Sequence, residues 1–294
     1  MSKQTVLILG LGEGGAYLAQ WLGSHSDVEQ VLAYDTAITG PRADVLREKA
    51  ANLGVELQET LADLPATVNI VFSLVPGHVA ITVADILKPL LKAESIYVDL
   101  NSVTPATIDE IGTLLEASGI DLVDGSILGS FQSGGQVPVF LSGPKAGTIY
   151  RLLDGAMFEP TTISAKPGDA SAVKMLRSVM MKGLEALVVE SLVAAEAQGL
   201  RSAFIRALQD MDEQRFTSMI EVLAVTHLLH APRRLGEIER VQAILQAKGV
   251  DDTMTEAARR VFSKTAADES IPLHEAISFD ETVKMLCRIF ADPS

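Results

Sequence analysis

A glycine-rich segment near the N-terminus has the spacing of a phosphate-binding turn. It reads Gly10-Leu11-Gly12-Glu13-Gly14-Gly15, directly after the apolar run of residues 5–9 and before an amphipathic segment near residues 14–23. In a G-x-G-x-x-G turn the glycines permit a tight bend, close approach of a pyrophosphate and packing of helix on strand. The helix N-terminus then faces the anion. We therefore expect all six residues to bind a dinucleotide; glycines that serve only the turn are the alternative.

An acidic residue follows these glycines at the position expected for a contact with ribose. Asp35 ends the run LAYDT about 20 residues further on, where a carboxylate accepts hydrogen bonds from the ribose of NAD. A 2′-phosphate would meet this charge, so we expect NAD, with NADP as the second choice because Arg42 and Arg47 are near in sequence. A turn cap is the alternative role of Asp35. Val75, at the end of the apolar run 68–75, is a further expected cofactor contact.

Three polar residues recur at a spacing of four in a long apolar segment. Lys174, Ser178 and Lys182 would share one face of a helix. A lysine in such a helix is either a surface residue with a buried stem or a buried amine with a lowered pKa that suits proton transfer. Oxidation of an alcohol needs a base for the hydroxyl proton and a hydride acceptor. Lys174 is a candidate base, and Ser178 would hold the hydroxyl or an adjacent oxygen.

Two smaller groups complete the candidate site. Asn101 and Ser102 follow a predicted strand at the edge where open α/β sheets bind ligands, so we expect contacts to nicotinamide or substrate; an N-cap for the helix near Pro105 is the alternative. A basic cluster lies later in the chain and consists of His227, His230, Arg233 and Arg234. We expect His230 and Arg234 to contact an anionic substrate, unless the arginines simply pair with nearby glutamates. We expect no metal site, and Cys287 is predicted to be buried and inert.

The predicted elements place these residues in an α/β fold. β-Branched runs at 5–9, 30–34, 68–75 and 95–100 alternate with helical segments, which favours a doubly wound, mostly parallel sheet, the Rossmann arrangement. The segment 137–142, a helix near 145–155 and the segment 159–164 look like the end of this sheet. We therefore predict a nucleotide-binding domain over residues 1–166.

The rest of the chain has the periodicity of helices. No proline occurs between Gly168 and Ala231, and apolar residues at helical spacing predict one long helix, with Asp169 or Ser171 at its start and Gly199 at its end. Further helices are expected at 201–210, 213–228, 232–249, 252–267 and 278–291. We therefore predict an all-helical domain over residues 167–294.

Composition excludes several classes of partner. A net charge of −14 disfavours nucleic acid and anionic membrane surfaces. Polar groups interrupt the longest apolar stretches, so we expect no membrane anchor. The N-terminal apolar run is not followed by a small-residue cleavage site, so we expect no signal peptide. A single cysteine cannot form an internal disulfide, which fits the reducing cytoplasm.

The sequence resembles the β-hydroxyacid dehydrogenase family, which includes 6-phosphogluconate and 3-hydroxyisobutyrate dehydrogenases. Three matches carry the resemblance: the glycines of residues 10–15, the segment DGSILGS at 124–130 where the family has D-A-P-V-S-G-G, and the pattern G-x-x-x-x-x-K that ends at Lys174. The resemblance implies that Lys174 is the general acid/base and that the segment 124–130, with Ser126 and Gly129, holds the carboxylate of the substrate.

Two departures from the family pattern affect the expected substrate. Leu128 stands where the family has a serine, and Ser178 stands where it has an asparagine. The C-terminal half looks like a poorly characterised branch with a phosphogluconate-dehydrogenase-like helical domain. The resemblance implies that residues 167–294 are a substrate and dimerisation domain, so we expect a homodimer. We expect an NAD(P)-dependent oxidoreductase acting on a small, anionic hydroxy or keto acid. The alternatives are a C=N (imine) reductase, which Lys174 disfavours, and a noncatalytic NAD-binding sensor or scaffold.

Overall fold

The computed structural model describes residues 3–129, 131, 135–271 and 277–291. The chain divides into two compact units, Met1–Val179 and Met180–Ser294.

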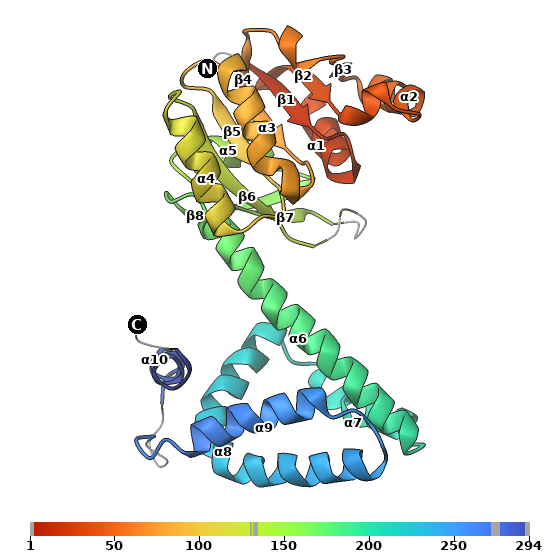
Figure 1. Cartoon of the computed structure of the whole chain (residues 1–294), viewed down its shortest axis with the longest axis vertical. Helices are drawn as coiled ribbons and strands as arrows, with labels where there is room; N and C mark the ends of the chain where they lie inside the picture. Colours follow the sequence, from red (N-terminus) through yellow and green to blue (C-terminus); the bar gives the residue numbers. More distant parts are fainter. Residues whose placement is uncertain (1–2, 130, 132–134, 272–276, 292–294) are drawn as a thin grey trace. The chain divides into compact units, whose positions relative to one another are not determined.

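The first unit is built on an eight-stranded sheet with the order β3-β2-β1-β4-β5-β6-β7-β8 (Figure 1). β7 runs antiparallel to β6, and the other neighbouring strands pair in parallel, for example Leu7 of β1 with Leu32 of β2 and Val71 of β4. The predicted doubly wound, mostly parallel sheet is confirmed. Its strands are β1 (Gln4–Leu9), β2 (Val28–Tyr34), β3 (Glu56–Leu57), β4 (Val68–Ser73), β5 (Ile96–Asp99), β6 (Asp121–Ile127), β7 (Val137–Ser142) and β8 (Phe158–Ser164).

Helices cover both faces of this sheet, because successive side chains of a strand point to opposite faces. Val6 and Ile8 of β1 pack into one core with residues of α1, α2 and α5, whereas Leu7 and Leu9 pack into a second core with residues of α3 and α4. These helices are α1 (Glu13–Gly23), α2 (Ala43–Leu53), α3 (Ala80–Leu87), α4 (Pro105–Glu116) and α5 (Ala146–Leu153). Short 3₁₀ turns are η1 (Thr36–Thr39), η2 (Leu61–Asp63), η3 (Gly77–Val79) and η4 (Lys88–Leu90).

The second unit is helical in the part of the chain that the structure describes, as the sequence periodicity predicts. The long helix α6 starts in the first unit and continues into the second, so the division of the chain after Val179 falls inside it. Gly199, with a φ of +69°, follows α6 as a left-handed C-terminal residue. The helices are α6 (Asp169–Ala197), α7 (Arg201–Ala207), α8 (Phe216–Ala247), α9 (Thr253–Ala266) and α10 (Phe279–Phe290), with a 3₁₀ turn η5 (Gln209–Met211).

One predicted helix boundary is wrong. Segments 213–228 and 232–249 form a single helix, α8, which contains Pro232. A proline removes one hydrogen bond to the carbonyl four residues earlier. Leu228 and Ala231 are fully buried beside it, so packing keeps the helix continuous where local sequence predicts a break.

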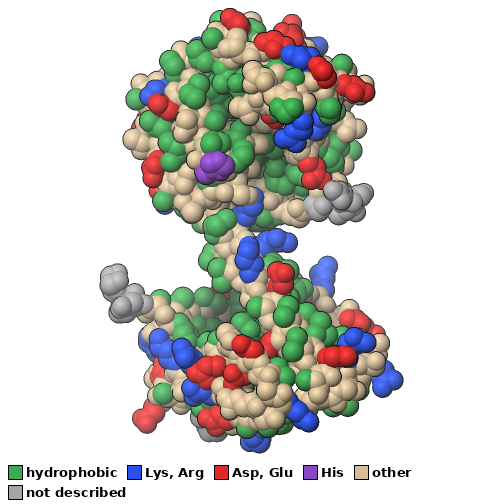
Figure 2. Space-filling model, turned by 45° about the vertical axis from the view of Figure 1, so that its right-hand side comes forward, with side chains coloured by type: hydrophobic (Ala, Val, Ile, Leu, Met, Phe, Trp, Pro, Cys, Tyr) green, Lys and Arg blue, Asp and Glu red, His purple; other side chains and the backbone are tan. Residues whose placement is uncertain are grey.

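The described residues include no helix that is long and apolar enough to cross a membrane. Large hydrophobic side chains nevertheless gather on the surface of the helical unit (Figure 2).

Candidate active site

The glycine loop joins β1 to α1, and its three motif glycines are required for different reasons. Gly10 has a φ of +84°, and a Cβ there would lie 2.4 Å from the carbonyl oxygen of Leu74. A Cβ on Gly15 would lie 2.0 Å from the carbonyl oxygen of Gly10. A Cβ on Gly12 would meet nothing within 4 Å. Packing within the chain therefore explains Gly10 and Gly15, whereas the absence of a side chain at Gly12 leaves open space in front of the helix N-terminus.

Two charged side chains hold the peptide units of this loop. Asp35 accepts hydrogen bonds from the backbone N–H of Leu11 and of Ala37, both at 2.9 Å, and thereby also caps η1. The turn-cap role of Asp35 is thus present. Lys49 of α2 donates from Nζ to the carbonyl oxygens of Leu11 at 2.7 Å and Gly12 at 2.9 Å. The sequence does not predict this role of Lys49, because no local motif marks a lysine that contacts a loop almost forty positions away.

The two arginines considered for NADP differ in their contacts. Arg47 pairs with Asp44 and Glu59, each at 3.3 Å. Arg42 precedes α2 and is exposed. Exposed ion pairs of this kind contribute little to stability. A 2′-phosphate would therefore have to compete with two carboxylates for Arg47.

A cavity of about 540 Å³ in the first unit joins the glycine loop to the start of α6. Of the predicted site residues, its lining contains Gly12, Glu13, Gly14, Gly15, Val75, Asn101, Ser102, Gly129 and Lys174. Arg177, one turn after Lys174, also lines it. The structure thus brings the predicted phosphate turn and the predicted base to one cavity.

Other predicted residues lie outside this lining. Gly10 and Leu11 belong to the glycine loop but do not line the cavity, and Asp35 binds the backbone N–H of Leu11. Ser126 is fully buried in β6, and its hydroxyl has no hydrogen-bond partner among the described residues. Ser178 is half-buried on α6. Ser130, quoted in the family match, lies outside the described residues.

Asn101 stabilises the cavity wall from within. Its amide oxygen accepts from the Val75 backbone N–H at 2.7 Å, and its amide nitrogen donates to Ser73 Oγ at 3.0 Å and Asp99 Oδ2 at 2.8 Å. Ser102 is exposed at the cavity. The alternative that Asn101 or Ser102 caps α4 is wrong, because the cap is Thr104, whose hydroxyl accepts from the backbone N–H of Thr107.

The first turn of α6 is capped by a residue from the sheet. Asp124 of β6 accepts from the backbone N–H of Gly168 at 3.0 Å and of Ser171 at 2.9 Å, and from Ser171 Oγ at 2.7 Å. Asp169, which the sequence proposed as a cap, accepts from Ser164 Oγ at 2.6 Å instead. Ser171 is a donor to the cap and not the cap itself.

The Lys174 amine lies in an unusual electrostatic environment. Burial lowers its pKa below 10.5, while the charges of Asp124 and Asp99 partly counter this effect. Burial also raises the pKa of Asp99 to about 6, although hydrogen bonds from Asn101 oppose this rise. Because the neutral amine is favoured by burial, Lys174 is a better proton acceptor near neutral pH than an exposed lysine.

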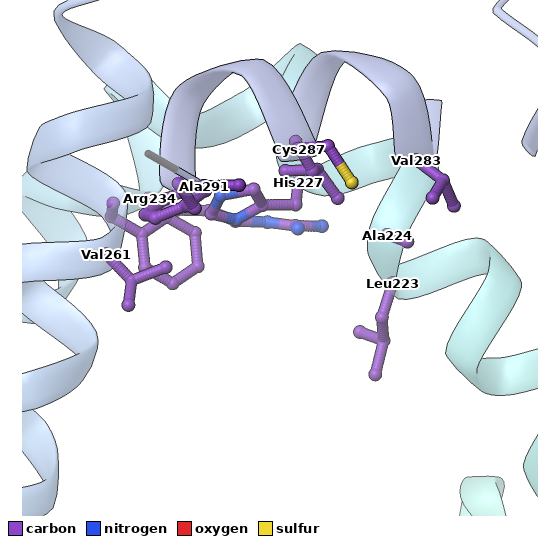
Figure 3. Close-up of a pocket in the computed structure, with 11 residues that line it drawn as sticks. Leu223, Ala224, His227, Arg234, Val261, Val283, Cys287 and Ala291 are labelled. Carbon is purple, nitrogen blue, oxygen red and sulfur yellow. The ribbon is translucent and has the colours of Figure 1, made fainter. Parts of the chain in front are cut away.

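The basic cluster lies in the helical unit, and its residues do not all line one cavity. His227 and Arg234 line an apolar cavity of about 820 Å³ between α8, α9 and α10 (Figure 3). His227 Nε2 lies 2.8 Å from Thr265 Oγ1, and Arg234 donates to Thr226 Oγ1 at 3.1 Å. His230 is exposed and does not line this cavity.

Two other side chains of this region test the predictions made from the sequence. Arg233 pairs with Glu237, as the alternative interpretation of the cluster predicts. Cys287 is exposed and lines the apolar cavity, so the prediction that it is buried is wrong. Cys287 lies on the amphipathic helix α10, and its sequence position alone does not predict which face of this helix packs against neighbouring helices. The described residues contain no group of side chains suited to hold a metal ion.

Comparison with known families now identifies the first unit. Residues 5–152 match the model of the NAD-binding domain of 6-phosphogluconate dehydrogenase. The chain belongs to this family. Residues 195–265 match a second model, a domain of unknown function termed DUF1932. This pair of matches confirms the resemblance to 6-phosphogluconate-dehydrogenase-like proteins and to a branch whose C-terminal domain is uncharacterised.

Two further proteins are similar to this chain over most of its length. An uncharacterised 28.5 kDa protein from Methanothermus fervidus is 26% identical over 254 residues, which cover 86% of this chain and 96% of the relative. A conserved protein of unknown function, whose structure is described as similar to 3-hydroxyacid dehydrogenases, is 29% identical with a TM-score of 0.59; the match covers 89% of this chain and 96% of that one.

A more distant likeness concerns the fold alone. A variant of the imine reductase from Myxococcus stipitatus, solved with NAD⁺, is 19% identical with a TM-score of 0.72 over 97% of this chain and 99% of that one. The same organism's enzyme has also been solved with NADP⁺. The chain therefore has an NAD(P)-binding fold of the oxidoreductase type, related to hydroxyacid dehydrogenases and shared with imine reductases.

Proposed function

We propose that the protein transfers a hydride between a nicotinamide cofactor and a small, anionic hydroxy or keto acid, with Lys174 as general acid/base. The observation that carries this proposal is the single cavity of the first unit, which both the glycine loop and Lys174 line. A proton-transfer group must lie within reach of the hydroxyl group on the carbon that gives up hydride, and a shared cavity supports such an arrangement.

The residues of the loop fit a dinucleotide. Gly12 lacks a Cβ where neither packing nor a left-handed backbone requires a glycine, since its φ is −69° and a Cβ would meet open space. The backbone of residues 12–15 would hold the pyrophosphate at the N-terminus of α1, and Asp35 would face the ribose, which favours NAD over NADP. A bound nicotinamide ring supplies the acceptor or donor of hydride.

The chain's own groups would manage the proton and the anionic substrate. In the oxidative direction, neutral Lys174 accepts the proton of the substrate hydroxyl; in the reductive direction, the protonated amine returns it to the carbonyl oxygen. Arg177 and the exposed Ser102 line the same cavity and suit a substrate carboxylate. Gly129, Ser178 and Ser126 are secondary candidates from this unit, and His230 and Arg234 are candidates from the helical unit.

The experiment is a titration with NAD and NADP followed by thermal unfolding, and then turnover with hydroxy acids, keto acids and cyclic imines. We expect NAD to stabilise the protein and Lys174→Ala to lower kcat at least 100-fold while cofactor-induced stabilisation persists. Lys166→Ala, which removes an exposed lysine just before α6, is the matched control. Unchanged turnover in Lys174→Ala, or no stabilisation by either dinucleotide, contradicts the proposal. Turnover of imines alone would favour a C=N reductase, and stabilisation without any turnover would favour a sensor.

We also propose a homodimer, formed through a helical substrate and dimerisation domain that comprises residues 167–294. Val189 and Val193 of α6 are 58% and 52% exposed, and Val222 and Ile244 of α8 are also exposed. Such a concentration of exposed apolar residues is typical of an interface. Sedimentation equilibrium should give a dimer, and Val189→Glu should weaken it. Val45→Glu, at a 66% exposed position of α2, is the control. A monomeric wild type contradicts the dimer.

We also propose a cytoplasmic location, because the single cysteine, Cys287, cannot form an internal disulfide and suits a reducing compartment.

A further inference from the structure

The carboxylate of Asp124 joins three parts of the first unit. It is fully buried in β6, and its Oδ2 accepts from the backbone N–H groups of Gly168 and Ser171 and from Ser142 Oγ of β7, at 3.0, 2.9 and 3.2 Å. Its Oδ1 accepts from Ser171 Oγ at 2.7 Å. A buried carboxylate is unfavourable unless hydrogen bonds compensate for the lost water. Four donors and the positive end of the α6 dipole provide this compensation.

These contacts fix the rotation of α6 about its own axis. Ser171 and Lys174 are three residues apart, so they lie on the same side of the helix, one turn from each other. Gly168 has a φ of +98°, which places its N–H toward Asp124 in a conformation that other residues rarely adopt. One carboxylate thus holds the first turn of the helix that carries Lys174, and Lys174 lines the cavity.

We propose that Asp124 is a positioning residue for Lys174: its carboxylate anchors the first turn of α6 to the sheet and so aims the amine into the cavity, while its negative charge acts on that amine. This inference rests on the proposed function for its catalytic consequence. It assigns to a residue of the sheet both the geometry and the electrostatics of a group on the helix.

The charge of Asp124 competes with burial at Lys174. Burial lowers the pKa of Lys174, and Asp124 and then Asp99 raise it. Among the described residues that line the same cavity, the other charged ones are Glu13 at the start of α1 and Arg177 on α6. Loss of the Asp124 charge should therefore lower the pKa of Lys174 further, and the amine should become neutral at a lower pH.

Two substitutions separate anchoring from charge. In Asp124→Asn, an amide oxygen in the place of Oδ2 still accepts from Gly168, Ser171 and Ser142, and the amide nitrogen donates to Ser171 Oγ once that hydroxyl turns to accept. The anchor is kept and the charge is lost. Asp124→Ala removes both. Asp169→Asn removes a carboxylate from the same helical turn, where Ser164 and not Lys174 is its neighbour, and is the matched control.

The experiment uses two readouts that need neither substrate nor cofactor. Competitive acetylation of the full-length protein across a pH series, quantified by mass spectrometry on the peptide that contains Lys174, gives the midpoint of amine reactivity. Hydrogen exchange of peptides over residues 166–175 reports on the anchor. We expect Asp124→Asn to shift the midpoint to lower pH with exchange unchanged. Asp124→Ala should accelerate exchange at least tenfold and shift the midpoint, and Asp169→Asn should leave the midpoint in place.

Two results would overturn the inference. A midpoint in Asp124→Asn equal to that of the wild type would show that the charge does not act on Lys174, and wild-type exchange in Asp124→Ala would show that the carboxylate is not the anchor. In steady-state assays, Asp124→Asn should move the pH profile of kcat in the direction of the acetylation midpoint. Full turnover in Lys174→Ala would remove the proposed proton transfer, whereas the acetylation and exchange results would still decide whether Asp124 positions the amine.

Discussion

The carboxylate of Asp35 accepts a hydrogen bond of 2.9 Å from the backbone N–H of Leu11. The same residue is also held at its carbonyl group, because Lys49 donates to the Leu11 carbonyl oxygen at 2.7 Å. Opposite charges thus fix one residue of the glycine loop at both its donor and its acceptor. A loop that is ordered before the ligand arrives loses less conformational entropy on binding.

Asp35→Ala should weaken NAD binding at least tenfold and reduce the preference for NAD over NADP. The substitution removes the proposed ribose acceptor, the anchor of the loop and the charge that opposes a 2′-phosphate. It also removes the cap of η1, which should destabilise the first unit by about 1 kcal/mol. Calorimetric titration with both dinucleotides measures the affinities. Asp44→Ala, at an exposed position of α2, is the control. An equal loss of affinity for both cofactors would mean that Asp35 acts through the loop alone.

Gly15→Ala should act mainly on stability, whereas Gly12→Ala should act mainly on dinucleotide binding. Gly15→Ala places a Cβ 2.0 Å from the Gly10 carbonyl oxygen and should destabilise the first unit by about 2 kcal/mol or more. Gly12→Ala meets no protein atom within 4 Å, so it should cost only about 1 kcal/mol as a poorer N-cap yet reduce dinucleotide affinity at least 100-fold. Fluorescence of Trp21, the single tryptophan, follows unfolding of the first unit. Normal cofactor binding in Gly12→Ala would contradict the proposed cradle.

The parts of the fold that could be predicted from sequence are those with local signals. The alternation of β-branched runs and helices predicted the sheet, and Gly199 predicted the end of α6. Pro232 shows the limit of such signals: a proline usually ends a helix, but the buried Leu228 and Ala231 keep α8 continuous through it.

The site was only partly predictable, because its supporting contacts join residues far apart in the chain. Asp124 contacts Gly168 and Ser171 across separations of 44 and 47 residues. No local pattern specifies either contact, nor the reach of Lys49 to the glycine loop. A family motif therefore predicts Lys174 from the sequence, but no sequence pattern predicts the residues that hold its helix in place.

His227 should make the stability of the helical unit depend on pH. Burial, and then the charge of Arg234, lower its pKa below 6.5. Below pH 6.5 the unfolded chain therefore binds the proton more readily, so the stabilisation by neutral His227 is present above pH 6.5 and is lost on acidification. His227→Gln keeps a donor for Thr265 without titrating.

Thermal unfolding followed by circular dichroism at pH 7.5 and 5.5 tests this relationship. The wild type should lose more Tm on acidification than His227→Gln. Trp21 fluorescence provides an internal control, since it reports on the first unit, where His227 is absent. Equal losses of Tm in the two proteins would contradict a pH-dependent contribution from His227.

Asp99→Asn should reveal the opposite pH dependence in the first unit. Both oxygens of Asp99 accept from Asn101, one from its backbone N–H at 2.9 Å and one from its amide nitrogen at 2.8 Å. An asparagine would turn an NH₂ group toward the amide nitrogen of Asn101, so we expect a loss of about 1–3 kcal/mol from the unsatisfied donors. The rearrangement should also disturb the Val75 backbone N–H, which Asn101 binds at the cavity.

The sign of the pH effect follows from the raised pKa of Asp99. Burial moves this pKa from 3.8 to about 6, so the contribution of the protonated group to stability is complete below pH 3.8 and is lost as the pH rises through 6. The difference in Tm between wild type and Asp99→Asn, followed by Trp21 fluorescence, should therefore be larger at pH 4.5 than at pH 7.5. Asp109→Asn, on the exposed side of α4, controls for the loss of a carboxylate. A Tm difference that grows with pH would show that Asp99 is stabilised as the anion, and that Lys174 and Asn101 outweigh its burial.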